Sequence, residues 1–233
     1  MKNFYLIALI ATLVSCGKET ADLTVKGNIK GLKKGTVYLK KLQDTAVITL
    51  DSFNINGSSG FELHSNMEAP EVLYLDLDKN SAENDRIAFF ANKGITEINT
   101  TLKNFVFDAQ INGSEQQKTL ENYKSMISKF NDQNLNLIKE SLEARKEADS
   151  TKLDSIERIY NNLLKRRYLY TVNFALNNKD SEVAPYLALT EIYDANIKLL
   201  DTINNSLTER VKTSKYGKEL QTYISTIKTQ ADN

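Results

Sequence analysis

The sequence has no tryptophan, one histidine and one cysteine among its 233 residues. A chain with a single cysteine forms no internal disulfide and lacks the paired thiols of thiol exchange or of a zinc site. His64 has no histidine or cysteine partner for a transition metal, and no acid is identifiable that would orient it as a general base. The chain also contains no nucleophile elbow, glycine-rich phosphate loop or HExxH motif. The sequence therefore predicts no catalytic, cofactor-binding or metal-binding residues, and a protein that is not an enzyme.

Neither sign of charge is in excess, because 30 lysines and arginines balance 30 aspartates and glutamates. Non-specific binding to nucleic acid and adhesion to anionic lipid both depend on a basic excess, so this balance argues against either. Two prolines and nine glycines leave little room for long flexible linkers. With 41% hydrophobic residues, the chain can nevertheless bury a core and differs from a disordered tail.

The start of the chain has the parts of a secretory signal. Lys2 supplies the positive charge, and residues 4–14 are apolar except for Thr12. This stretch spans only about half of the ~30 Å hydrocarbon core, so it is a poor permanent transmembrane helix. The motif LVSC, which ends at Cys16, resembles the bacterial lipobox, in which the cysteine is lipidated and the chain is cleaved before it. We therefore expect residues 1–15 to be a lipoprotein signal peptide and Cys16 to be the lipid attachment site. The alternative is an ordinary cleaved signal peptide.

Lipidation at Cys16 predicts a protein held at the cell envelope by its anchor, with residues 16–21 as the lipidated tether. Two or three acyl chains, at about 0.8 kcal/mol per buried CH₂, make a stable anchor. Gly17, which stands where aspartate would retain a lipoprotein at the inner membrane, resembles the outer-membrane sorting pattern. Lys18 and Glu19 resemble, incompletely, a surface-export signal, and the alternative is a solvated tether. We expect an outer-membrane location, with the periplasmic and surface faces both left open.

Residues 22–113 alternate between apolar and polar side chains, which is the period of a β-strand. Eight short segments have this pattern, namely LTVKGNIKG, TVYLKKL, AVITLDSFNI, GFELHS, EVLYLDLD, RIAFFAN, ITEINTTL and FVFDAQI. Turn residues such as Asn56-Gly57 and Asn112-Gly113 separate them. The expected fold of this module is an antiparallel β-sandwich or a partly closed barrel.

Over residues 114–233 the apolar spacing changes to three and four, which is typical of amphipathic helices. Two long seams predict an antiparallel helix pair, and their members are Leu120, Tyr123, Ile127, Phe130, Asn134 and Leu137, then Leu153, Ile156, Tyr160, Leu163, Arg167, Tyr170 and Phe174. Thr151 and Asp154 predict a capping box for the second helix. A third helix is expected near Ser181, with Pro185 in its first turn. Shorter helical segments are expected over residues 186–193, 196–207 and 216–228. The predicted fold class is α+β, with the two parts packed as one body.

Three sets of residues are candidate sites, and a structural alternative is favoured for each. Residues 76–85 begin like an EF-hand calcium loop but lack its glycine and its final glutamate, so we favour a solvated hairpin tip with Asp76 on the outward face of a strand. Asn134 and Arg167 interrupt the helical seams and are interpreted as setting register or reaching solvent at an edge. The aromatic residues of the helical part, which are candidates for a groove but are interpreted mainly as core, are Tyr160, Tyr168, Tyr170, Phe174, Tyr186 and Tyr193.

The runs VKGNIKGLKKGTVYLKK, LDSFNINGSSGFELHSNMEAPEVLYL and INGSEQQKTLENY resemble a module of Bacteroidota lipoproteins known as domain of unknown function 4369. The matching residues are Gly27, Ile29, Gly31, Leu32, Val37, Tyr38, Leu39, Asp51, Ser52, Gly57, Phe61, Pro70, Gly113 and Ser114. In that family the module and a following helical segment precede a thioredoxin-like domain of thiol-disulfide oxidoreductases. The run SKYGKELQTYI resembles the end of that helical segment. Because the sequence has no CxxC motif, we expect the module without the redox domain.

Three functions remain open. The favoured one is a non-catalytic, lipid-anchored cell-envelope protein that acts as a binding or interaction module. The second is an accessory that docks a separate thioredoxin-like oxidoreductase of the envelope. The third is a hydrolase that uses carboxylates of the sandwich on an envelope glycan or peptide. The expected partners are the membrane, through lipid at Cys16, and an envelope protein, with no nucleic acid and no cofactor.

Overall fold

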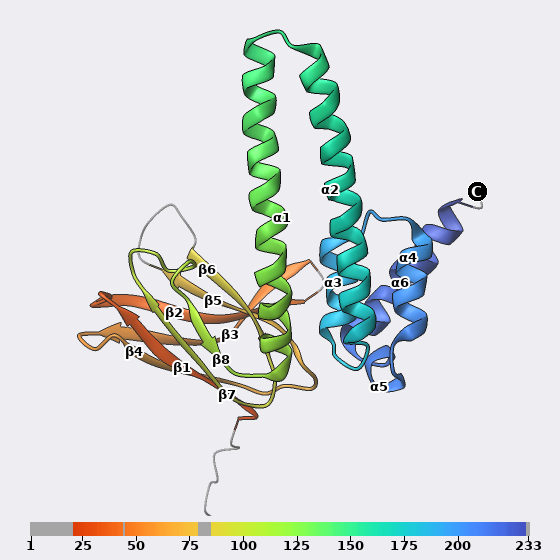
Figure 1. The fold of residues 1–233 in the computed structure, drawn as a ribbon. Helices are drawn as coiled ribbons and strands as arrows, with labels where there is room; N and C mark the ends of the chain where they lie inside the picture. The colour runs from red at the N-terminus through yellow and green to blue at the C-terminus, as the bar shows by residue number, and fades with distance from the viewer. Residues whose placement is uncertain (1–20, 44, 79–84, 232–233) are drawn as a thin grey trace, which may run out of the picture.

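A computed structural model describes residues 21–43, 45–78 and 85–231 of the chain (Figure 1). The described residues form eight strands and then six helices. The strands are β1 (Leu23–Lys30), β2 (Lys34–Gln43), β3 (Ala46–Asn56), β4 (Gly60–Ser65), β5 (Glu71–Asp78), β6 (Asp85–Ala91), β7 (Gly94–Thr101) and β8 (Gln110–Asn112). The helices are α1 (Glu115–Lys146), α2 (Ser150–Asn177), α3 (Val183–Glu191), α4 (Ile197–Ser206), α5 (Glu209–Lys212) and α6 (Lys215–Ala231). This order confirms the α+β class.

The strands form two four-stranded sheets, in the orders β4-β1-β7-β8 and β3-β2-β5-β6. Alternate apolar residues of both sheets point between them and form one buried core. Its fully buried members include Leu23, Leu39, Leu63, Leu75, Phe89 and Ile98. Because the two inner faces share this core, the arrangement is the predicted sandwich.

One pairing departs from the antiparallel sandwich that the sequence predicts, because β1 and β7 run parallel. The two strands approach closely at Gly27. A Cβ atom there would lie 1.7 Å from the carbonyl oxygen of Ile98 on β7, so only glycine fits this position. Side-chain alternation predicts which face a residue occupies but carries no information on the direction of the neighbouring strand. The sequence pattern therefore could not reveal the parallel pair.

The eighth predicted strand is wrong over most of its length. Residues 103–108 form turns, and the strand is confined to β8. Thr100 Oγ1 donates a hydrogen bond to the carbonyl oxygen of Phe105 at 2.7 Å, and Phe105 fills the core while Phe107 is 93% exposed. The apolar run FVF thus buries one side chain, and the turn holds its backbone away from the sheet.

The two long helices, α1 and α2, form the predicted antiparallel pair (Figure 1). The N-cap of α2 is Asp149, whose side chain accepts a hydrogen bond from the Lys152 backbone N–H at 2.9 Å. The predicted capping box of Thr151 and Asp154 is therefore wrong, because an earlier aspartate takes the capping position. The short helix α5 was not predicted. Within the part of the chain that the structure describes, none of the helices has the length and hydropathy of a membrane span.

The helical part packs on the outer face of β5 and β6, and the two parts share a second core. Its buried residues are Val72, Phe90, Leu120, Tyr123, Ile127, Val183, Leu187 and Tyr216. At the base of α1, Ser114 Oγ donates to the Phe90 carbonyl oxygen and Gln117 Oε1 accepts from the Phe90 N–H, both at 2.7 Å. These bonds satisfy the backbone of edge strand β6 and fix the point at which α1 leaves the sandwich.

Candidate interaction surface

The long helices project beyond both the sandwich and the remaining helices, as Figure 1 shows. We call residues 131–166, the distal parts of α1 and α2, the helical arm. Every residue of this stretch is described, and only Ala144, Ile156 and Leu163 in it are buried. Nearer the base, α1 packs on β6 while α2 packs on α3 and α4. Apart from Asn161, Leu164 and Lys165, which share a groove with the start of α4, the arm therefore consists of two helices whose sides no third element of the described chain covers.

One side of the arm carries a groove of about 570 Å³ between the two helices. The residues that line this arm groove are Asn134, Leu137, Ile138, Ser141, Leu142, Arg145, Leu153, Asp154, Ile156, Glu157 and Tyr160. Ile138, Leu142 and Tyr160 are 49%, 55% and 43% exposed. Leu135 is 62% exposed and shares one side of α1 with Ile138 and Leu142, at spacings of three and four. A contiguous row of large apolar side chains open to solvent is the feature that marks interaction sites.

The opposite side of the arm has fewer exposed large apolar side chains. Its groove is smaller, about 290 Å³, and is lined by Gln133, Asn136, Leu137, Ile159, Asn162, Leu163 and Arg166. Among these residues Ile159 is the one exposed large apolar side chain. The two sides differ enough that Ile159 and Arg166 serve as matched controls for residues of the arm groove.

Opposite charges lie on the two walls of the arm groove. Arg145 comes from α1, whereas Asp154 and Glu157 come from α2. Among the described residues, none of these three side chains takes part in an ion pair. Asn134 in the same groove has a buried side-chain oxygen with no hydrogen-bond partner in the described part of the chain. Exposed apolar side chains between charged walls form the kind of surface that accommodates amphipathic helices.

Arg167, the second polar interruption of the predicted seams, lies below the arm. Its Nη2 donates to Oε2 of Glu191 on α3 at 2.7 Å, and both side chains are about a third exposed, at 32% and 29%. The residue thus reaches a partner at the edge of the helical part and ties α2 to α3. It does not join the arm groove.

The aromatic side chains of the helical part divide between core and surface. Those that pack into the second core are Tyr170, Phe174 and Tyr186. Tyr168 Oη donates a hydrogen bond to Asp194 Oδ1 at 2.7 Å. Burial of the phenol, and to a smaller extent this hydrogen bond, raise the pKa of Tyr168 to about 12. Tyr193 is 54% exposed, and Tyr160 lines the arm groove. Of the six aromatic candidates, Tyr160 is the one that belongs to this surface.

Asp76 points away from the sandwich core, as predicted, but it is not solvated. The residue is 6% exposed and accepts two hydrogen bonds from Arg86, each at 2.7 Å. Lys40 Nζ lies 3.0 Å from the same carboxylate. These cations come from the neighbouring strands β6 and β2, so Asp76 is the centre of a cross-strand ion-pair network. Residues 79–84 of the candidate calcium loop lie outside the described residues.

The Asp76→Asn variant is expected to lose about 2 kcal/mol of unfolding free energy at pH 7, because charge-assisted hydrogen bonds contribute about that much. Burial alone would raise the pKa of Asp76, but hydrogen bonds from Arg86 and Lys40 outweigh it and hold that pKa below its usual value. The contribution is therefore complete above the ordinary carboxyl pKa of about 4 and is lost as the pH falls through the lowered value. Urea unfolding at pH 7 and in acid measures this, with Asp132→Asn as an exposed control. A deficit that stays constant on acidification would contradict this role.

His64 has an acid beside it that sequence reasoning did not find. Its Nε2 lies 3.2 Å from Oε1 of Glu62, and its Nδ1 lies 3.3 Å from the Thr24 hydroxyl. Glu62 is two residues earlier on the same face of β4, so strand alternation was the available signal. The side chains of His64 and Glu62 are 49% and 55% exposed. Both groups face solvent, and the pair remains a surface contact.

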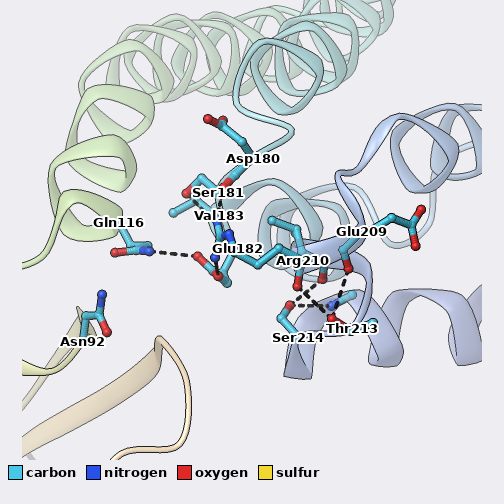
Figure 2. A network of polar contacts seen from close by, with 12 residues as sticks. Asn92, Gln116, Asp180, Ser181, Glu182, Val183, Glu209, Arg210, Thr213 and Ser214 are labelled. Carbon is cyan, nitrogen blue, oxygen red and sulfur yellow. Dashed lines mark hydrogen bonds and ion pairs between the residues drawn. The ribbon is translucent and has the colours of Figure 1, made fainter. Parts of the chain in front are cut away.

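A buried carboxylate joins the base of α1 to the C-terminal helices, as Figure 2 shows. Glu182, the residue before α3, is 1% exposed. Its Oε2 accepts a hydrogen bond from Gln116 Nε2 at 2.8 Å, and its Oε1 accepts from Arg210 Nη1 on α5. Arg210 also donates to the carbonyl oxygen of Asp180. Because both carboxylate oxygens already have partners within the chain, this network locks the helices together and offers no open oxygen to a ligand.

Cys16 and the rest of residues 1–20 lie outside the described residues, so the structure says nothing of the predicted signal peptide and lipid site. Within the described ranges, no group of three or more His, Cys, Asp or Glu side chains comes together in a way that would hold a metal ion.

The β-rich part of the chain can be compared with known families. Residues 23–120 match the family described as Domain of unknown function (DUF4369). The match begins with β1, spans all eight strands and ends within α1, so the resemblance predicted from glycine turns and strand patterns is confirmed for this stretch. The close approach of the backbones at Gly27 explains one of the matching glycines. The helical arm lies beyond the matched residues. Among curated proteins, no match to the chain is found.

Proposed function

We propose that this protein is a non-catalytic binding protein of the bacterial cell envelope, held at a membrane by lipid at Cys16. The arm groove is its contact surface for a protein partner. The observation that carries the proposal is the row of exposed apolar side chains at Leu135, Ile138 and Leu142, on a side of the arm that no other element of the described chain covers. Burial of such side chains is the main source of affinity between proteins.

The position of the arm supports this proposal. In Figure 1 the turn between α1 and α2 lies at the opposite end of the molecule from the start of β1. At 1.5 Å per residue the 32 residues of α1 extend about 48 Å. An anchor preceding β1 would therefore hold the arm well away from the bilayer. Anchoring also raises the effective concentration of the arm toward other proteins at the same membrane.

The proposal includes an outer-membrane lipoprotein of the Bacteroidota type. Three observations support it, namely the lipobox-like LVSC motif, the glycine that follows Cys16 and the family match over residues 23–120. A docking site for a separate thioredoxin-like oxidoreductase remains the alternative use of the same surface.

Disruption of the arm groove is expected to remove the partner. A tagged full-length chain carrying Ile138→Glu and Leu142→Glu should recover at least about tenfold less partner after cross-linking in its own envelope, because each buried charge costs more than 1.4 kcal/mol. Quantitative mass spectrometry of the purified material measures this. Ile159→Glu, on the opposite side of the arm, should recover as much partner as the unaltered chain. Cys16→Ser should leave the membrane fraction and recover less.

Two results would count against this proposal. Equal recovery by the double variant and by Ile159→Glu would exclude the arm groove as the contact surface. Measurable turnover of an envelope glycan or peptide by the purified chain would favour the hydrolase alternative. A CxxC-bearing thioredoxin-like protein among arm-dependent partners would identify the protein as a redox accessory.

A further inference from the structure

We infer that the partner seated in the arm groove is a second copy of this chain, so that two arms pack side by side as a four-helix bundle. The inference rests on the proposed function, because it names the occupant of the same surface. It follows from the charges on the groove walls, their height along the arm, and the apolar side chains between them.

The charges make the groove complementary to itself. A two-fold axis parallel to the arm turns one groove onto the other and exchanges the walls, because α1 of one copy then faces α2 of the second. Arg145 of each copy would meet the acidic wall formed by Asp154 and Glu157 of the other, and symmetry would give this contact twice. In one copy these side chains take part in no ion pair among the described residues. Walls of a single sign would instead repel an identical surface.

The charged residues lie at matching heights. Arg145 is in the last turn of α1, which ends at Lys146. Asp154 and Glu157 lie in the first two turns of α2, which starts at Ser150. All three therefore sit near the turn that joins the helices, and they meet only when the two arms run parallel. An antiparallel pairing would set α1 against α1 and move the acidic wall away from Arg145.

The apolar side chains supply the contact between the charged walls. Leu135, Ile138 and Leu142 have the three-four spacing of a helix-bundle seam on α1, and Tyr160 of α2 lines the same groove as Ile138 and Leu142. Two helices alone leave such a seam open, whereas a second pair completes it. Asn134 is a polar residue within the seam, with a side-chain oxygen that has no partner in the described residues. Asparagine at such a position fixes the register of helix pairs.

The parallel arrangement also suits the proposed anchor. The start of β1 lies at the end of the molecule opposite the arm turn (Figure 1). A two-fold axis along the arm leaves both β1 starts on the same side, so lipids on both copies would enter one membrane. An antiparallel pair would point them in opposite directions.

Charge reversal with rescue tests this inference. Sedimentation equilibrium of the detergent-solubilised full-length protein should show a monomer–dimer equilibrium. Arg145→Glu should weaken the dimer at least about tenfold, because repulsion replaces attraction at two symmetry-related contacts. Asp154→Arg with Glu157→Arg should weaken it similarly, and the chain with all three changes should recover the original dimer. Arg166→Glu, on the opposite side of the arm, should have no effect. Circular dichroism checks that each variant stays helical.

Several results would overturn the second copy as occupant. The first is a protein that stays monomeric at all concentrations. The second is a dimer whose affinity is unchanged by every charge reversal, and the third is a triple variant that does not regain the original dimer affinity. If the protein is monomeric but envelope partner recovery still depends on Ile138 and Leu142, the second copy is excluded while the proposed function stands. If neither assembly nor recovery responds to changes in the arm groove, both fail.

Discussion

The Phe90→Ala variant is expected to lose about 3–5 kcal/mol of unfolding free energy. Phe90 on edge strand β6 is fully buried between the sandwich and the helices. Its ring makes edge contacts with Tyr186 and Tyr216, at centroid distances of 5.6 and 5.7 Å. Alanine would leave a cavity at the junction of the two parts, because neither the sheet nor the helices can close onto it.

Chemical denaturation followed by circular dichroism measures this loss. Phe107→Ala removes the same side chain from a position that is 93% exposed and should change stability by no more than about 0.5 kcal/mol. If Phe90→Ala were as stable as Phe107→Ala, the second core would not hold the two parts together. An unfolding curve that separates into two transitions would instead show that the parts fold independently once the junction is weakened.

The Arg210→Ala variant is expected to lose about 3 kcal/mol, and more than Glu182→Gln loses. The reason is an asymmetry of burial, since the Glu182 side chain is 2% exposed whereas that of Arg210 is 60% exposed. Removing Arg210 leaves the buried carboxylate of Glu182 without a cationic partner, and an unpaired buried charge destabilises the folded state. Removing the charge of Glu182 leaves a guanidinium that can turn toward water, and the glutamine retains a partner for Gln116. We expect a loss of about 1–2 kcal/mol for Glu182→Gln.

Lys212→Ala is the control for this comparison. Lys212 pairs with Glu209 at 3.1 Å on the same helix α5, but the Glu209 side chain is 86% exposed, so its removal should cost less than about 1 kcal/mol. Denaturation midpoints of the three variants give the ranking directly. A larger loss of unfolding free energy for Glu182→Gln than for Arg210→Ala would mean that the carboxylate is not the buried member of the ion pair.

The first seven strands could be predicted because each has one side in the sandwich core. Burial on one side imposes the period of two that the sequence displays, as in the alternation of Leu73, Leu75 and Leu77 toward the core. The run FVF wrongly predicted a strand, because composition alone does not distinguish a strand from a turn with one buried side chain. The parallel pairing of β1 with β7 had no local signal, since it joins segments about seventy residues apart in the chain.

The candidate surface was only partly visible in the sequence. The predicted seams named Tyr160 and Asn134, both of which line the arm groove. Leu135, Ile138 and Leu142 lie beside that seam, and nothing in the spacing says whether another element covers them. The Glu182 network was invisible for a related reason, because Gln116, Glu182 and Arg210 come from three segments that lie far apart in the chain.

The sequence by itself determined the α+β class, the antiparallel helix pair and the family resemblance of the β-rich part. These follow from local periodicity and turn chemistry, which act over a few residues and leave a direct record in residue order. The tertiary structure alone decided which apolar side chains of the arm stay exposed, which charges share a groove and which carboxylates are buried with a cationic partner. Exposure depends on what the rest of the chain places nearby, and no short stretch of sequence contains that information.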